Sequence, residues 1–230
     1  MGSHIAHKEI IYCLFPCRAI NLQDYLMIMK NDAVSKTIRT YEETAEDFYK
    51  DHSDISEIKN IADFFIKNLK GKKILDVGCG PGRDAKYFSE KGLDITGIDL
   101  TKKFIEMASK NAPKARFIRM DMRKIDFSPN TFDGIWSCAS FLHLPKSEAK
   151  STLREFRRIL KPRALLYISI KEGDKEKFVK KDEYKGYTKL FAFYSKKELK
   201  NLIKSSKFNI LKIIINRKKD VWINVFAIKQ

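Results

Sequence analysis

Short runs of apolar residues alternate along this chain with longer segments in which apolar residues recur every three or four positions. Runs of the first kind are typical of buried strands, whereas the longer spacing is typical of amphipathic helices. The predicted strands are Lys73–Val77, Leu93–Leu100, Ala115–Met122, Phe132–Trp136, Lys161–Ile170, Phe208–Ile215 and Val221–Ile228. Residues 216–220 are polar and predict a hairpin turn between the last two strands.

The helical spacing is clearest between Ile55 and Leu69, where apolar residues would line one side of a helix and cover one face of a sheet. Gly71 is a suitable residue to end that helix. A second helix is predicted to begin at Ser195, because a serine followed three residues later by Glu198 is a capping pattern. Further helices are predicted at residues 84–90 and 147–160.

A glycine-rich loop joins the strand Lys73–Val77 to the helix that begins at Asp84. Glycines stand at positions 78, 80 and 82. Glycine has no side chain, so the backbone there can turn tightly and approach a ligand closely. The helix that follows offers unpaired N–H groups and the positive end of its dipole. A strand, a loop and a helix in this order indicate a nucleotide pocket.

The residues around the loop indicate which nucleotide binds. Dinucleotide-binding loops have the pattern G-x-G-x-x-G, but Arg83 stands where the third glycine would be. Asp76, at the end of the strand, would oppose a bound pyrophosphate and favour a cationic ligand. The pattern therefore disfavours a nicotinamide dehydrogenase.

The loop resembles the first motif of class I S-adenosylmethionine (SAM)-dependent methyltransferases of the small-molecule type. Three later segments are similar to further motifs of this family. The strand Leu93–Leu100 contains Asp99, 19 residues after Gly80, and an acid in this position can accept hydrogen bonds from both ribose hydroxyls. The resemblance implies that Asp99 does so and that Leu100 lies against the adenine.

The third and fourth matching segments follow in the family's order. Asp121 ends the strand Ala115–Met122, and the resemblance implies that it accepts from the adenine amino group while the Met122 N–H meets a ring nitrogen. The strand Phe132–Trp136 leads into a loop that, in this family, lines the methyl-transfer side. The cofactor contacts implied by the resemblance are Tyr41, Asp76, Gly78, Cys79, Gly80, Arg83, Asp99, Leu100, Asp121, Met122 and Ser137.

The resemblance covers residues 41–170 and implies an α/β fold. The expected architecture is a seven-stranded, Rossmann-like, mostly parallel sheet with helices on both faces and an antiparallel C-terminal hairpin. We expect an N-terminal extension at residues 1–40, which starts like an expression tag and continues as an accessory segment, and a methyltransferase domain at residues 41–230. Residues 171–194 are charged and aromatic, and the family places substrate-contacting insertions there.

Composition limits the class of protein. The 230 residues suffice for a full core, and no apolar run reaches the roughly 18–20 residues that a membrane helix needs. The four cysteines are too scattered for a disulfide scaffold, and Cys13 and Cys17 lack further ligands for zinc. These features favour a cytoplasmic protein with no metal and no membrane partner. The net charge of +17 suits either a solvated basic surface or a polyanionic partner.

Few residues are candidates for catalysis. His143 follows the fourth strand, and the ordinary pKa of histidine suits a general base near neutrality; a structural hydrogen bond is the alternative role. Cys138 is a candidate nucleophile, but its neighbours Ser137 and Ala139 do not match the Pro-Cys or Thr-Cys signature of carbon-5 methyltransferases.

The sequence narrows the chemical class of the methyl acceptor only in part. Residues 137–140 lack the Asn/Asp-Pro-Pro-Tyr/Phe motif of enzymes that methylate exocyclic amines or glutamine, and no separate RNA-binding module is visible. We therefore expect S-adenosyl-L-methionine as cofactor, S-adenosyl-L-homocysteine (SAH) as product, and an O, N or S nucleophile of a small molecule as acceptor. An RNA methyltransferase that uses the basic surface, and a SAM-binding protein without catalytic activity, are the alternatives. The sequence does not indicate the oligomeric state.

Overall fold

The computed structural model describes residues 33–230. The predicted accessory segment up to residue 32, with Cys13 and Cys17, lies outside the described residues. The helices are α2 (Ala33–His52), α3 (Lys59–Asn68), α4 (Arg83–Glu90), α5 (Lys102–Asn111), α6 (Lys146–Ile159) and α7 (Lys196–Ser205), with short 3-10 turns η1 (Ser56–Ile58), η2 (Phe141–His143) and η3 (Asp182–Tyr184). The predicted boundary at residues 40/41 falls inside α2.

Seven strands form the main sheet, in the order β3-β2-β1-β4-β5-β9-β8. Their bounds are β1 (Lys73–Val77), β2 (Asp94–Asp99), β3 (Arg116–Arg119), β4 (Phe132–Cys138), β5 (Leu160–Lys171), β8 (Phe208–Arg217) and β9 (Val221–Lys229). The first five strands pair in parallel, whereas β9 runs antiparallel to both β5 and β8. The expected seven-stranded, mostly parallel sheet with a C-terminal hairpin is confirmed.

Two strands outside the main sheet form a small sheet of their own. β6 (Glu176–Lys180) and β7 (Thr188–Ala192) pair antiparallel within the segment 171–194. The sequence pattern did not predict them as strands, because their residues mix charged and aromatic side chains without a regular alternation. Hydrogen bonds to α2 hold β7 in place: the Leu190 N–H donates to Thr37 Oγ1 at 2.8 Å, and Thr40 Oγ1 donates to the Thr188 carbonyl at 2.7 Å.

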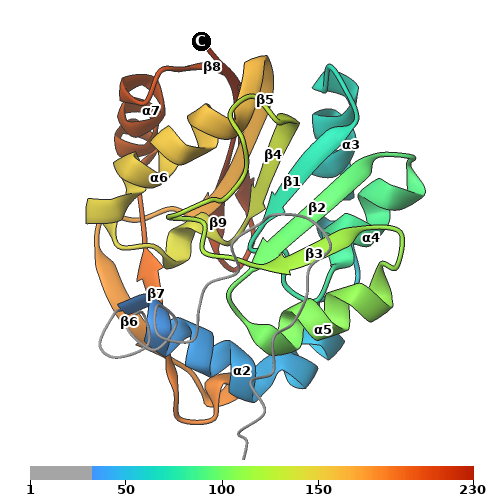
Figure 1. The fold of residues 1–230 in the computed structure, drawn as a ribbon. Helices are drawn as coiled ribbons and strands as arrows, with labels where there is room; N and C mark the ends of the chain where they lie inside the picture. Colours follow the sequence, from blue (N-terminus) through green and yellow to red (C-terminus); the bar gives the residue numbers. More distant parts are fainter. Residues whose placement is uncertain (1–32) are drawn as a thin grey trace, which may run out of the picture.

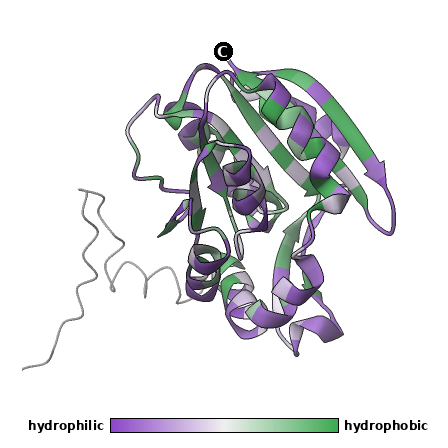
Figure 2. Ribbon diagram, turned by 90° about the vertical axis from the view of Figure 1, so that its right-hand side faces the viewer, coloured by the Kyte–Doolittle hydropathy of each residue, from purple (hydrophilic) through white to green (hydrophobic). Residues whose placement is uncertain are grey.

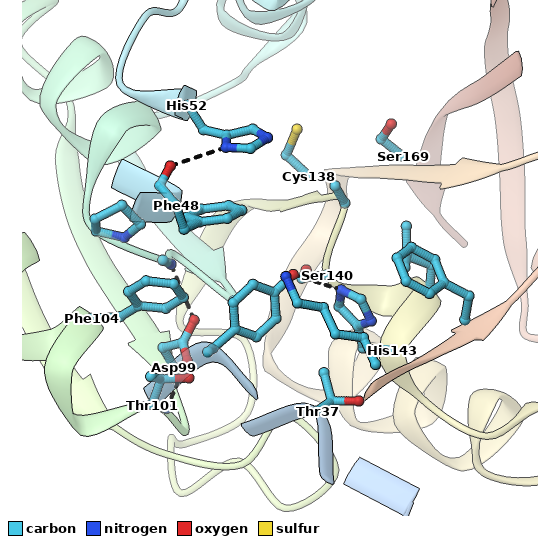
Figure 3. A pocket seen from close by; sticks show the side chains of 18 of the residues that line it. Thr37, Phe48, His52, Asp99, Thr101, Phe104, Cys138, Ser140, His143 and Ser169 are labelled. Carbon is cyan, nitrogen blue, oxygen red and sulfur yellow. Dashed lines mark hydrogen bonds between the residues drawn. The ribbon is translucent and has the colours of Figure 1, made fainter. Parts of the chain in front are cut away.

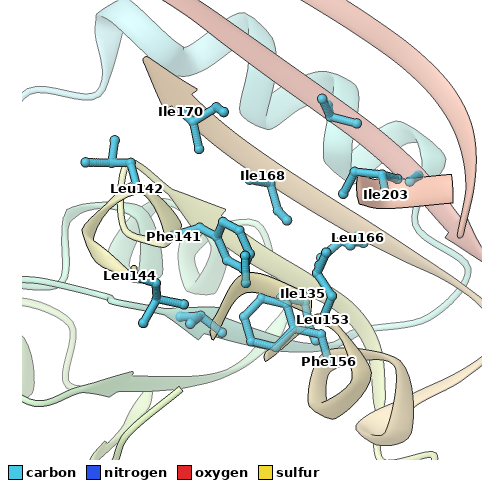
Figure 4. Packing of buried hydrophobic residues seen from close by; sticks show 14 of the residues in the cluster. Ile135, Phe141, Leu142, Leu144, Leu153, Phe156, Leu166, Ile168, Ile170 and Ile203 are labelled. Atoms are coloured by element: carbon cyan, nitrogen blue, oxygen red, sulfur yellow. The ribbon is translucent and has the colours of Figure 1, made fainter. Parts of the chain in front are cut away.

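The core lies on both faces of the main sheet, because successive side chains of a strand point to opposite faces. Leu166, Ile168 and Ile170 of β5 pack in the cluster that includes residues of α6 and α7, and Figure 4 shows this packing. Leu165 and Tyr167 pack in the second cluster, with residues of α3 and α4. Figure 2 shows hydrophobic residues along the central strands and mixed residues along the helices, as expected for amphipathic helices on a sheet.

The carboxyl ends of the parallel strands lie toward α2 and the β6–β7 sheet (Figure 1). In open α/β sheets ligands bind outside this edge, where the strand order reverses. Here the reversal falls between β1 and β4, which are neighbours in the sheet but are separated in sequence by β2 and β3. The fold therefore places a crevice at the end of β1, under α2.

Candidate active site

A cavity of about 760 Å³ opens at this edge of the sheet. Its volume falls in the range of about 300–1,000 Å³ that is usual for ligand sites. Its lining includes Gly80, Asp99, Leu100, Phe104 and Met122 on one side, and His143, Tyr184, Lys189, Phe191 and Trp222 on the other. Tyr41 lies between the two sides, because its ring centre is 5.3 Å from that of Phe104 and 5.6 Å from that of His143. Figure 3 shows Asp99 and Phe104 on one side of the cavity and His143 on the other.

The glycine loop follows β1 and forms part of the wall. The N–H groups of Gly78 and Cys79 both donate to the Ile98 carbonyl, at 2.8 and 3.1 Å, which ties the loop to β2. Gly78 has a φ of +68°, and a Cβ there would lie 2.3 Å from the Cβ of Ser140. At Gly80 a Cβ would meet nothing closer than Phe48 at 4.0 Å. Gly78 is therefore required by packing, whereas Gly80 leaves room for a ligand against the backbone.

Asp99 ends β2 and lines the cavity. Its Oδ2 accepts from the Gly80 N–H at 3.1 Å and its Oδ1 accepts from the Thr101 N–H at 2.8 Å. Burial raises the pKa of this carboxyl, and the two N–H donors oppose that rise. An ionised carboxylate has about four acceptor positions, so both oxygens can still accept from ligand hydroxyls.

Asp76 lies behind the glycine loop, only 2% exposed, and does not line the cavity. Its Oδ2 has no hydrogen-bond partner within residues 33–230. Burial and the nearby Asp84 hold the pKa of Asp76 well above its usual range, and Arg83 opposes this effect. A buried polar atom without a partner is unusual in a native protein. A cationic group in the adjoining crevice would provide one.

Arg83 begins α4 and also lines the cavity. Its Nε donates to Asp84 Oδ1 at 2.6 Å, and the other oxygen of Asp84 accepts from Trp136 Nε1 at 2.7 Å. This chain of hydrogen bonds links the start of α4 to the middle of β4. It holds the guanidinium of Arg83 in place beside the glycine loop.

Tyr41 and His143 form a hydrogen-bonded pair within the lining. His143 Nδ1 lies 2.6 Å from the Leu190 carbonyl, which can only accept, so Nδ1 carries the proton. Nε2 is then the acceptor, and the Tyr41 hydroxyl donates to it at 2.9 Å. Burial lowers the pKa of His143 to about 4, with Lys189 and Lys171 adding to the effect and the carbonyl opposing it. The imidazole is therefore neutral at pH 7.

Three of the site residues expected from sequence lie outside the cavity lining: Asp76, described above, Asp121 and Ser137. The carboxylate of Asp121 accepts from the backbone N–H of Arg123 at 2.8 Å and from its guanidinium, which also pairs with Glu148. Ser137 is fully buried and hydrogen-bonds to Ser140 Oγ at 2.8 Å. Their contact with a cofactor stays a prediction. The other residues expected at the site line the cavity: Tyr41, Gly78, Cys79, Gly80, Arg83, Asp99, Leu100, Met122 and His143.

The lining also contains residues that sequence reasoning did not single out. Thr37, Phe48 and Phe104 come from α2 and α5, and Lys189 comes from β7. Lys189 had one detectable signal, because it is a lone charge within the otherwise apolar and aromatic segment from Tyr187 to Phe193.

Other kinds of site find no support in the described part of the chain. Within residues 33–230 no group of three or more His, Cys, Asp or Glu side chains could hold a metal ion. No helix in the same range is both long and apolar enough to cross a membrane.

Comparison with known proteins identifies the fold and its central segment. Residues 74–163 match the family described as a methyltransferase domain. The chain is 33% identical over 105 residues to demethylmenaquinone methyltransferase of Thermotoga maritima and 31% identical over 107 residues to ubiquinone biosynthesis O-methyltransferase of Paracidovorax citrulli. These matches cover 45% and 44% of this chain and the same shares of the two relatives. The chain thus spans less than half the length of both.

A solved structure resembles the fold over nearly the whole chain. The 1,6-didemethyltoxoflavin-N1-methyltransferase of Burkholderia thailandensis, solved with 1,6-didemethyltoxoflavin and S-adenosylhomocysteine, superposes with a TM-score of 0.69. The alignment covers 99% of this chain and 98% of that one, at 17% identity. The chain therefore has the fold of this methyltransferase, and its central segment, residues 74–163, matches a methyltransferase domain.

Proposed function

We propose that this protein transfers a methyl group from S-adenosylmethionine to an O, N or S nucleophile of a small molecule by direct displacement. One observation carries the proposal: a single cavity joins the glycine loop and Asp99 on one side to His143 and an aromatic wall on the other, with Tyr41 between them. A cofactor can therefore reach an acceptor without leaving the protein. The free thiols of Cys79 and Cys138 support a cytoplasmic location as part of the same proposal.

The residues present fit the cofactor. Asp99 has acceptor capacity for ribose hydroxyls, and Leu100 and Met122 offer apolar surface for an adenine. Arg83 in the lining suits the cofactor's carboxylate, and the unpartnered Oδ2 of Asp76 would suit its amino group if the glycine loop, behind which it lies, moved aside. The open space at Gly80 allows close approach to the backbone. Asp121 could also serve the adenine amino group, if its carboxylate kept its bonds to Arg123 as well.

S-adenosylmethionine supplies a methyl group that its positively charged sulfur has already activated. The protein then has to orient the acceptor and exclude water, and orientation alone can supply on the order of 7–11 kcal/mol in favourable cases. α2 and β7 cover the cavity, and Tyr41 and His143 offer polar atoms for the acceptor. With a pKa of about 4, His143 is a weak base, and its Nε2 is reached through the Tyr41 hydroxyl.

The proposal is tested by calorimetric titration of the protein with SAM, SAH and NADH. We expect binding of SAM and SAH and no binding of NADH. A radiolabelled methyl donor is then incubated with the protein and with cell extract divided into metabolite, RNA and protein fractions. Label in the metabolite fraction supports the proposal. Label in RNA supports the alternative of an RNA methyltransferase that uses the basic surface. Binding of SAM without transfer of label indicates a SAM-binding protein without catalytic activity. NADH binding without SAM binding would refute the proposal.

The role of His143 is tested with His143→Ala. If His143 accepts a proton during transfer, turnover should fall by roughly 100-fold or more, while SAH affinity stays unchanged. In the wild type, the fall of turnover on the acidic side should lie near pH 4, because His143 protonates at that pKa and not near 6.5. Steady-state rates across pH measure both effects. Unchanged turnover of the variant at every pH would remove His143 from the mechanism.

A further inference from the structure

Lys189 is a buried lysine in the wall of the cavity. It stands on β7, opposite Val179 of β6, and is only 4% exposed. Its Nζ lies 3.7 Å from the centre of the Tyr41 ring and 4.1 Å from that of Tyr184, with Phe48 at 5.5 Å. The amino group is thus held between aromatic rings from α2 and η3, at the surface of the cavity.

No carboxylate of the described residues lies within 4 Å of this amino group, and no hydrogen bond from it is found there. Other lysines around the cavity do have carboxylate partners. Lys185 pairs with Asp47 at 2.6 Å, Lys181 with Glu183 at 3.1 Å, and Lys171 with Asp220 at 2.5 Å. Three carboxylates around the cavity are therefore paired with other lysines and not with Lys189.

An ammonium group that is buried without an anion is costly, and aromatic faces compensate for only part of this cost. Burial lowers the pKa of Lys189 to about 7; Lys181 and Lys171 add repulsion, and Glu183 opposes the shift. A negatively charged ligand beside Nζ would restore the missing partner and favour the charged amine.

The rings of Tyr41 and Phe48 separate Lys189 from Phe104 and Gly80, and its other neighbours connect it to His143. Leu190, the next residue, accepts the hydrogen bond of His143, and Tyr41 both contacts the amino group and donates to His143. Beyond them stand the aromatic rings of Phe191 and Trp222, with the Lys171 Nζ 5.3 and 5.2 Å from their centres. Arg83, beside the glycine loop, is a separate cation for the cofactor's own carboxylate.

We propose that Lys189 recognises the methyl acceptor and that this acceptor is a small aromatic molecule with an acidic group, bound as an anion next to Tyr41. The inference rests on the proposed function, since it names the acceptor class of the same cavity. The anionic oxygen lies against Lys189, and the aromatic body packs on Phe191 and Trp222. This pairing holds the acceptor beside the Tyr41 hydroxyl.

The test compares two probes of equal shape, 2-naphthoate and its neutral amide, by calorimetric titration of the SAH-loaded protein. The wild type should bind the acid roughly 10- to 100-fold more tightly than the amide. Lys189→Met should bind both equally, with unchanged SAH affinity. Lys180→Met is the matched control, because it removes an exposed lysine from the same small sheet, and it should keep the preference. Thermal unfolding checks folding, and Lys189→Gln replaces the methionine variant if that one unfolds.

Three results would overturn the inference. The first is a wild type that binds the acid no more tightly than the amide, and the second is a Lys189→Met protein that keeps the preference. The third is a variant that loses SAH affinity by the same factor, because the lysine would then bind the cofactor. If the wild type binds no SAH, the proposed function fails by itself, and the same probe comparison without SAH still decides whether Lys189 forms an anion site.

Discussion

Asp99→Asn should weaken SAH binding by roughly 100- to 1,000-fold. Each hydrogen bond to a charged group contributes about 1.5–3 kcal/mol, and because asparagine keeps one acceptor oxygen, we expect a loss near the lower end of the sum for two such bonds, roughly 3–4 kcal/mol. Asparagine has the shape of aspartate but only one acceptor oxygen, and its NH₂ group would face the N–H of either Gly80 or Thr101. Calorimetric titration with SAH measures the loss.

The control for Asp99 comes from the same strand. Asp94 begins β2 at the end remote from the cavity and is exposed, so Asp94→Asn removes the same charge without touching the site. We expect its SAH affinity to equal that of the wild type. If both variants bind SAH normally, Asp99 is not a ribose ligand. The proposal that the cofactor binds on the Asp99 side of the cavity would then be refuted as well.

Gly78→Ala is the second change with a large expected effect. The new Cβ would lie 2.3 Å from the Cβ of Ser140, in a backbone conformation with φ of +68° that alanine disfavours. Neither atom is at the end of a flexible side chain, so the loop or the η2 segment has to move. We expect a loss of roughly 3–4 kcal/mol in the free energy of unfolding. Cofactor binding should be lost as well, because Gly78 precedes the loop residues that line the cavity.

Gly92→Ala is the control that measures the cost of the backbone strain alone, without a steric clash like the one with Ser140. Gly92 has a similar φ of +79°, but a Cβ there would meet nothing within 4 Å. This variant should lose only about 1 kcal/mol, which is roughly 2–4 °C in Tm for a chain of this size, and should bind SAH normally. Thermal unfolding of both variants gives the comparison. Equal losses at the two positions would show that the contact with Ser140 is unimportant.

These experiments address the two ends of the cavity independently. Gly78 follows β1 and Asp99 ends β2, on the side where we propose that the cofactor binds, whereas Lys189 and His143 lie on elements that close the cavity from the other side. Loss of SAH binding with Asp99→Asn and loss of acid preference with Lys189→Met would therefore be separate results, each with its own control.

The sequence alone determined the main sheet and the glycine loop, because both depend on local patterns. Apolar runs of five to ten residues form strands wherever they are covered on both faces, and the glycines between Val77 and Arg83 have local conformational roles. Differences in detail occurred at the ends of elements: β3 stops at Arg119, before Asp121, and the predicted helix Ile55–Leu69 divides into η1 and α3.

Only the tertiary structure decided which residues share the cavity. Hydrogen bonds between α2 and β7 join residues about 150 positions apart, such as Thr37 and Leu190, and no local pattern indicates such a pairing. They bring Tyr41, His143 and Lys189 together, whereas Arg123 draws the Asp121 carboxylate into an ion-pair network outside the lining. Strand and helix preferences depend on near neighbours along the chain, but burial, charge pairing and pKa depend on what folding places nearby.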